Sequence, residues 1–573
     1  MILRLASLFA IFGRKVERQL ARIAVRRGLA VLYVGLLSLG LNITGALLLG
    51  IPNPVVHDEF SYLLAADTFS HGRLSNPPHP MHPHFETMHV LQQPTYASKY
   101  TPGQGLLLAA GRVLGGRFIV GSYIGTALAC AATCWMLVAW VRPKWALIGG
   151  VLCAFHPYVL EWGQSYWGGT LPLLGGSLLL GGVRRATVRP APPEGFFMGL
   201  GMGVLALCRP YEGMILSILS LAMLAVWLVQ RQRRFPLVAA MRLLSGVLPP
   251  LLIAATVMLL HNRAVTGRFD KLPYAAYEER YSIIPLFLIQ DPRNREIGYH
   301  SREMSQLYEW TKAEYFRQKS RGFVRMILDG GAEALALQFP GVDLGRAALS
   351  LDQSEIKYVL WTSFPWLLFQ APLFLNPAIA FRRGTLAATL LLALFTSSLS
   401  IELWRYTHYT AAAMGLVLVL NVRSLRQWRL CTFRGWRIGL AVARTTLLLA
   451  LLWPLLLTSS RLGQDDVISR FASNRARIAS ELQDGRKHLV IVRYSPDHSF
   501  QTEWVYNEAD IDNALVVWAR DLGPERNARL RRYFSSRTTW LLEADQRHPY
   551  LVPYTLAPGN ETRQGNARSQ PSS

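Results

Sequence analysis

An acidic pair stands shortly after the first long apolar segment of the chain. Asp58 and Glu59 follow the uncharged residues 29–51. A carboxylate at the end of such a segment can accept a proton from an acceptor hydroxyl, which is the task of a general base. Because Asp58 precedes the helix-like residues 60–69, it can also be the N-cap of a helix, and the two roles are compatible. We therefore name Asp58 and Glu59 as candidate catalytic residues, with Asp58 as the base.

Further ionisable residues stand in short turns between apolar segments, namely Glu161, Arg209, Glu212, Glu402 and Arg405. Ionisable groups at helix ends that face a cavity are functional candidates, whereas a long side chain at an interface can simply extend its charge into water. Both interpretations stay open for Glu161 and Glu212. We interpret Arg209 and Arg405 as functional cations.

The elements that must position these side chains are membrane-spanning helices. The chain is 51% hydrophobic and only 17% charged, whereas soluble domains are about 25% charged. A helix of roughly 20 apolar residues crosses a bilayer, and about eleven segments qualify. They are residues 29–51, 118–141, 145–160, 166–183, 195–208, 213–230, 243–260, 359–381, 385–400, 406–422 and 445–460. The sequence also predicts an interfacial helix, or a helix extension, over 104–117.

The positive charge of the chain is distributed by topology. The formal net charge is +24. The basic residues cluster between apolar segments, as cytoplasmic loops require, and this pattern excludes nucleic-acid binding. It predicts a multi-pass protein of the inner (plasma) membrane with a cytoplasmic N-terminus, residues 1–28, and a membrane domain over 29–460. Two long loops, 52–103 and 261–357, and the C-terminal tail are then periplasmic or extracellular.

The tail has the composition of a soluble domain. Periodicity predicts a small α/β domain over 461–556, and residues 557–573 have a disordered composition. The expected elements are helices over 466–484 and 524–534, and strands over 488–493, 515–518 and 539–542. Asp510 and Asp512 have the D-x-D spacing that holds a metal–nucleotide sugar in other proteins. Because nucleotide sugars are not expected outside the cell, we interpret the pair as a helix or turn cap.

Two motifs together resemble those of a known family. The acidic pair after the first span, and the stretch from Lys99 through Tyr100, Thr101 and Pro102 to Gly103, resemble the GT-C glycosyltransferases. The second matches the Lys/Tyr-x-Pro-Pro-Gly motif of the protein O-mannosyltransferase and aminoarabinose-transferase branch, with Thr101 where many members have proline. The resemblance implies a GT-C-like fold and sugar transfer from a polyprenyl-phosphate donor to an acceptor on the outer face. It also implies that Asp58 is the base and that Lys99 lies near the donor phosphate.

This chemistry needs few groups. The leaving group is a phosphate, so cations that stabilise its developing charge replace a strong general acid. From their placement we add Arg209, Arg405 and His408 to Lys99 as donor-phosphate ligands. Tyr62, Tyr100, Glu161 and Glu212 are candidates for contact with the sugar or the acceptor, although an interfacial aromatic belt explains the tyrosines equally well. The acceptor can be a lipid, a glycan or a protein.

Other interpretations remain open. His79, His82 and His84 can offer imidazoles to Zn²⁺, but the intervening prolines disfavour one cage, and the proposed reaction requires no cofactor. A transporter or flippase of lipid-linked saccharides would place polar groups in the middle of the membrane, and a non-catalytic envelope assembly protein needs no charged outer turns. Nearly uncharged helix centres, with polar groups at one face, favour the enzyme.

Overall fold

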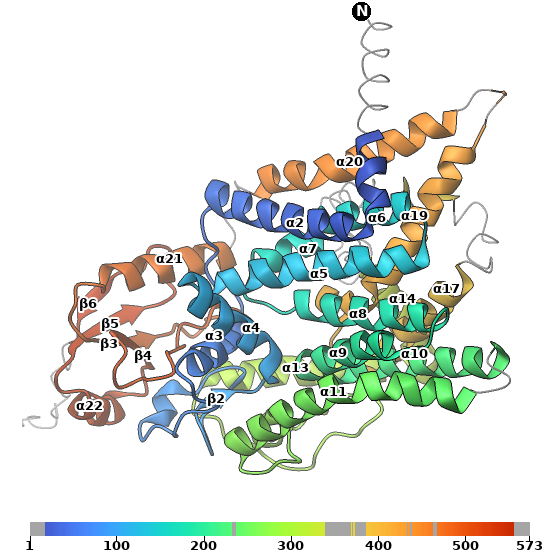
Figure 1. The fold of residues 1–573 in the computed structure, drawn as a ribbon. Helices are drawn as coiled ribbons and strands as arrows, with labels where there is room; N and C mark the ends of the chain where they lie inside the picture. Colours follow the sequence, from blue (N-terminus) through green and yellow to red (C-terminus); the bar gives the residue numbers. More distant parts are fainter. Residues whose placement is uncertain are drawn as a thin grey trace, which may run out of the picture.

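The structure is a computed structural model that describes residues 18–231, 236–338, 368–369, 371–372, 385–432, 434–435, 438–461 and 467–554. Figure 1 shows a layered bundle of helices with a small sheet domain at one end of it. The predicted span over 359–381 falls almost entirely outside the described residues. So do the beginning of the N-terminal segment and the predicted disordered tail.

Long apolar helices run between the two ends of the bundle. Among the described residues, four helices are long and apolar enough to cross a membrane. Two of them, α2 (Arg27–Leu49) and α5 (Ile119–Trp140), lie side by side in Figure 1. The others belong to α10 (Pro210–Arg231) and α11 (Pro236–Thr266). The 22 residues of α5 span about 33 Å, which is the thickness of a hydrocarbon core.

Shorter helices occupy most of the other predicted spans. The segment predicted as one helix over 145–160 consists of two helices, because Pro157 lacks an N–H and begins a new helix. The span predicted over 406–422 begins with the short helix α18 (Thr407–Thr410). The remaining bounds are α6 (Pro143–Ala154), α7 (Pro157–Gly163), α8 (Thr170–Ala186), α9 (Pro192–Cys208), α17 (Leu386–Ser398), α19 (Met414–Leu430) and α20 (Ile438–Arg461).

Glycines allow the central helices to approach each other closely. A Cβ on Gly175 of α8 would lie 2.9 Å from the carbonyl oxygen of Gly201 in α9. A Cβ on Gly176 would lie 1.9 Å from the carbonyl oxygen of Ala412. Small residues at such crossings are typical of helices that pack within a bilayer. The resulting bundle is a compact support for the segments at its ends.

The first predicted outer loop, 52–103, is an ordered segment. It contains α3 (His57–Ser70) and the short antiparallel strands β1 (Val90–Leu91) and β2 (Ala97–Ser98). The helix predicted over 104–117 is α4 (Pro102–Gly115). It begins with proline at its first position and ends at Gly116, whose φ of +73° suits glycine.

The second predicted outer loop is largely helical in its described part. Helix α11 continues to Thr266, so this segment begins later than the predicted residue 261. It contains α12 (Pro273–Tyr281), α13 (Arg302–Lys319) and α14 (Phe323–Ala336). We call 52–103 the first outer segment and 267–338 the second.

The tail folds as a small α/β domain. Strand β3 (His488–Arg493) lies between parallel neighbours, and the sheet order is β4-β3-β5-β6. The three predicted strands and both predicted helices are confirmed. Strand β6 was not predicted, because it has three residues and ends in proline at the sheet edge. The other bounds are α21 (Val467–Glu481), β4 (Val516–Arg520), α22 (Pro524–Tyr533), β5 (Thr538–Glu543) and β6 (Leu551–Pro553).

The tail domain packs directly on the first outer segment, beside α3 and α4 in Figure 1. Phe60 of α3 stacks on Tyr506, with ring centroids 4.4 Å apart. Buried Arg520 donates hydrogen bonds to Glu503 in the tail and to Glu303 in α13. The tail domain and both outer segments therefore join over one end of the bundle.

Candidate active site

Asp58 lies in the first turn of α3 with an accessible carboxylate. The helix begins after Val56, so the alternative role of Asp58 as the N-cap is wrong. Its Oδ1 accepts a short hydrogen bond from the Tyr100 hydroxyl, and its Oδ2 lies 3.9 Å from Nε2 of His89. The side chain keeps 25% of its surface exposed. Asp58 is therefore held on one side and reachable on the other.

The capping role belongs to Glu59. Its Oε2 accepts a hydrogen bond from the backbone N–H of Val55 at 2.7 Å, and its Oε1 accepts one from the N–H of Tyr166 at 3.0 Å. The residue is almost fully buried, and burial raises the pKa of its carboxyl to about 7. Glu59 thus ties the start of α3 to the turn before α8 and does not face the same space as Asp58.

The raised pKa of Glu59 predicts a pH-dependent stability. The folded-state pKa lies above the unfolded one, so this contribution is complete below about pH 4 and is lost as the pH rises through 7. The unfolding free energy should fall by up to about 3 kcal/mol between pH 5 and 8. Thermal unfolding of Glu59→Gln, which has no carboxyl to titrate, should lack this decrease. An identical pH slope in both proteins would refute the assignment.

Lys99 is a buried cation directly after β2. Its Nζ lies 3.6 Å from Oε1 of Glu278 in α12 and 4.5 Å from the centre of the Tyr274 ring. Burial holds the pKa of Lys99 below its usual value, and the nearby charges of Glu278 and Asp58 offset part of this shift. The two carboxylates thus favour the protonated form of the amine, whereas burial disfavours it.

Arg209 is the second cation of the same region, in the turn between α9 and α10. Its Nη1 lies 3.6 Å from Oε1 of Glu212, and its guanidinium lies 4.2 Å from the centre of the Tyr409 ring. Burial lowers the pKa of Lys99 and raises that of Tyr62, and the charge of Arg209 lowers both. The charge of Arg209 therefore reaches both Lys99 and Tyr62, and the two cations belong to one region.

The structure brings seven of the ten predicted site residues into one region. Tyr62 stacks on Tyr100, with ring centroids 4.4 Å apart. His408 lies close enough to Arg209 for an electrostatic interaction between them. We call the following group the Asp58 site: Asp58, Tyr62, Lys99, Tyr100, Arg209, Glu212, Glu278 and His408.

Three predicted residues lie elsewhere. Glu59 is the cap described above, and Glu161 is exposed on α7. Arg405 donates from Nε to Glu333 at 2.8 Å and from Nη2 to Gln318 at 2.9 Å. Both partners belong to the second outer segment, so Arg405 holds that segment instead of facing Asp58.

Several residues of the region were not predicted. Glu278 and Tyr274 come from α12, in a segment that the sequence indicated only as a loop. Their four-residue spacing places them on one helix face and was the available signal. His89 has a positive φ of 63° beside β1 and carried no recognisable pattern.

The crowded histidines of the first outer segment have separate partners. His79 contacts Asp512 at 3.3 Å, His82 contacts Gln93 at 3.0 Å, and His84 contacts the carbonyl oxygen of Arg520 at 2.9 Å. Within the described ranges, no group of three or more metal-binding side chains converges. Asp510 accepts a hydrogen bond from the N–H of Asn513, which confirms its interpretation as a turn cap.

No family model matches the chain, and no curated protein matches it. The structure is similar to that of apo ArnT from Cupriavidus metallidurans, with 12% identity, a TM-score of 0.48, and coverage of 88% of this chain and 92% of that chain. The structure of ArnT bound to undecaprenyl phosphate is similar with 12% identity and a TM-score of 0.47, and the match covers 91% of this chain and 92% of that chain. The Archaeoglobus fulgidus oligosaccharyltransferase in complex with Zn and sulfate is similar with 12% identity and a TM-score of 0.47, and the match covers 90% of this chain and 67% of that chain. At such values, function has to be argued from the residues of this chain.

Proposed function

We propose that the protein is a membrane glycosyltransferase that moves a sugar from a polyprenyl-phosphate donor to a hydroxyl acceptor on the outer face. One observation carries the proposal: an accessible carboxylate, Asp58, stands near the buried cation Lys99 and the largely buried cation Arg209 at the end of the bundle. The motif around Lys99 resembles that of enzymes with this chemistry. The overall orientation follows from the basic clusters, with a cytoplasmic N-terminus and the tail outside.

Asp58 acts as the general base in this proposal. It takes the proton of the acceptor hydroxyl as the acceptor oxygen forms its bond to the anomeric carbon of the sugar. The bond from that carbon to the phosphate oxygen breaks, and its electron pair stays on the phosphate. The hydrogen bond from Tyr100 keeps the carboxylate oriented during this step.

Lys99 and Arg209 receive the charge that develops on the phosphate. Each cation lies 3.6 Å from its carboxylate neighbour, Glu278 or Glu212, beyond the roughly 2.7–3.2 Å of protein hydrogen bonds. A phosphate can therefore compete with these carboxylates, and with the Tyr409 side chain that hydrogen-bonds to Arg209, for the two cations. Arg209 would bind the phosphate oxygens bidentately, and Lys99 would bind them as a point charge. Fixed cations in a buried site stabilise a leaving phosphate more strongly than water does.

The location suits a donor that is anchored in lipid. Helix α2 ends shortly before Asp58, and Tyr62 packs with Tyr123 near the start of α5. The polyprenyl chain can stay in the bilayer while its phosphate reaches these helix ends. In this proposal Tyr62 and His408 contact the sugar or the acceptor. We assign positioning roles to Glu59 and Arg405. The proposed reaction requires no divalent cation.

Profiling of lipid-linked sugars in cells without the protein tests this function. One polyprenyl-phosphate sugar should accumulate, and one envelope glycan, lipid or protein should lose the corresponding residue. Restoring the chain should reverse both changes. Unchanged donor and acceptor pools would contradict the proposal.

A flippase would also disturb these pools, so a second measurement separates it from an enzyme. Purified protein with the accumulated donor and its acceptor in detergent micelles, where no second membrane face exists, should release free polyprenyl phosphate. Donor that stays intact under these conditions would exclude transfer.

A further inference from the structure

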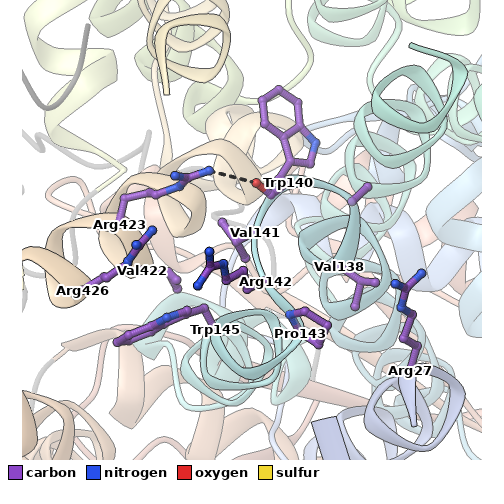
Figure 2. A pocket seen from close by; sticks show the side chains of 11 residues that line it. Arg27, Val138, Trp140, Val141, Arg142, Pro143, Trp145, Val422, Arg423 and Arg426 are labelled. Atoms are coloured by element: carbon purple, nitrogen blue, oxygen red, sulfur yellow. Dashed lines mark hydrogen bonds between the residues drawn. The ribbon is translucent and has the colours of Figure 1, made fainter. Parts of the chain in front are cut away.

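A pocket of about 480 Å³ lies at the opposite end of the bundle from the Asp58 site. Figure 2 shows it between the end of α5, the start of α6 and one side of α19. Its wall includes Trp140 and Trp145 and the cations Arg27, Arg142, Arg423 and Arg426. The chain enters α5 beside the Asp58 site and leaves it at this pocket, so about 33 Å of helix separates the two.

The four arginines come from three segments that are far apart in the sequence, since Arg423 and Arg426 share α19. In Figure 2, Arg142, Arg423 and Arg426 extend toward one side of the pocket, with Arg27 on the other. Nη2 of Arg423 donates to the carbonyl oxygen of Trp140 at 3.2 Å, and its Nε is buried without a hydrogen-bond partner in the part of the chain that the structure describes. Its guanidinium is thus only partly satisfied.

Four positive charges line the pocket. Within the described ranges, no ion pair joins any of its four arginines to a carboxylate. Arg142 and Arg426 lie close enough to Arg423 to oppose its charge, and so does Arg184. Topology explains why arginines occur at this end of the helices. It does not explain their convergence on one cavity, which costs repulsion unless an anion is bound.

We propose that this pocket binds the phosphate-bearing headgroup of an anionic bilayer lipid. Guanidinium groups match phosphate oxygens bidentately, and basic pockets between helix ends hold anionic headgroups at the cytoplasmic face. Trp145 offers an amphipathic ring of the kind that sits at headgroup depth. Val138 and Val422 give the wall apolar surface for the first carbons of a lipid chain.

This site is independent of the proposed transfer reaction. The donor phosphate belongs at the Asp58 site, and the arginine pocket lies at the other end of α5. Binding here would anchor the cytoplasmic end of the bundle in an anionic membrane. Loss of lipid binding at the pocket and loss of sugar transfer are therefore separately measurable.

Binding of a fluorescent phosphatidylglycerol to the full-length protein in uncharged detergent tests the proposal. The double variant Arg423→Gln/Arg426→Gln should raise the Kd about tenfold or more, because two charge-assisted contacts are removed. The matched control Lys144→Gln/Arg429→Gln removes two exposed cations of the same end that do not line the pocket. It should change the Kd less than about twofold. Equal weakening in both variants would overturn the proposal, because binding would then follow surface charge alone.

Competition identifies the source of the phosphate. Unlabelled phosphatidylglycerol should displace the probe, whereas phosphatidylcholine of the same chain length and millimolar inorganic phosphate should not. Displacement by phosphatidylcholine would show that apolar contact suffices, and displacement by inorganic phosphate would show a site for the free ion. Either result overturns the assignment to an anionic lipid. A conservative Arg423→Lys variant, which keeps the charge, should bind more tightly than Arg423→Gln.

Discussion

Replacement of Asp58 by asparagine should lower the kcat of sugar transfer by about 100- to 10,000-fold, the usual contribution of a general base. Asparagine keeps the size of the side chain and can still accept the hydrogen bond from Tyr100. It cannot take a proton from the acceptor. Donor binding should weaken by no more than about twofold, because in the proposed mechanism Asp58 contacts the acceptor and not the phosphate. A donor titration gives both quantities, because the rate at saturation reports kcat and the midpoint of the titration reports donor binding.

A matched substitution controls for a nonspecific effect of the amide. Asp270 lies in the second outer segment, and its side chain is 70% exposed and paired with Arg268. Asp270→Asn makes the same chemical change away from the Asp58 site and should leave kcat within about twofold, as surface substitutions usually do. If Asp58→Asn also retains wild-type kcat, Asp58 is not the base.

Replacement of Lys99 by methionine should lower kcat by about 100- to 1,000-fold, the usual cost of removing one group that stabilises transition-state charge. The same change should destabilise the fold, because Glu278 would lose its partner in a buried setting. Activity loss in the single variant is therefore ambiguous. The thermal unfolding midpoint should fall together with the rate.

The double variant Lys99→Met/Glu278→Gln resolves this ambiguity. It removes both charges, so the unfolding midpoint should recover most of the loss, while kcat should remain low because the phosphate still lacks its cation. If Lys99 and Glu278 form only a structural ion pair, the double variant recovers activity along with stability. Lys99→Arg, which keeps a cation, should retain more activity than Lys99→Met.

The helices and strands were largely predictable because their signals are local. Uncharged stretches such as 29–51 and 118–141 are stable only when they are buried in protein or lipid, and strand 488–493 contains the continuous apolar run 489–492. The break at Pro157 shows the limit of this approach. The apolar character of 145–160 continues across Pro157, so hydropathy predicted one helix. Hydropathy does not register that proline lacks the N–H needed to continue a helix.

The Asp58 site was predictable only in part. Asp58 and Arg209 stand out because charges at apolar helix ends are costly without a role, whereas Lys99 was indicated only by the resemblance of its motif. Arg405 met the same criterion, but its partners Glu333 and Gln318 come from a segment whose fold the sequence did not indicate. Which of two similar arginines faces Asp58 is decided by long-range packing. The same holds for Glu278, whose relation to Lys99 appears only when α12 is placed.

The arginine pocket illustrates this point at the other end of the bundle. Arg142 and Arg423 belong to the basic clusters between apolar segments, which the sequence analysis interpreted only as topology signals. Their convergence with Arg27 depends on how α2, α5 and α19 pack, which no local pattern contains.

The most direct test of the central claim is a structure of Asp58→Asn with a bound polyprenyl-phosphate sugar, since a variant without its base should bind the donor and not turn it over. We predict that the phosphate lies in contact with Lys99 and Arg209, with the anomeric carbon facing residue 58. A donor phosphate bound beside Arg405, or among the arginines at the opposite end of α5, with residue 58 out of reach of the sugar, would contradict the account.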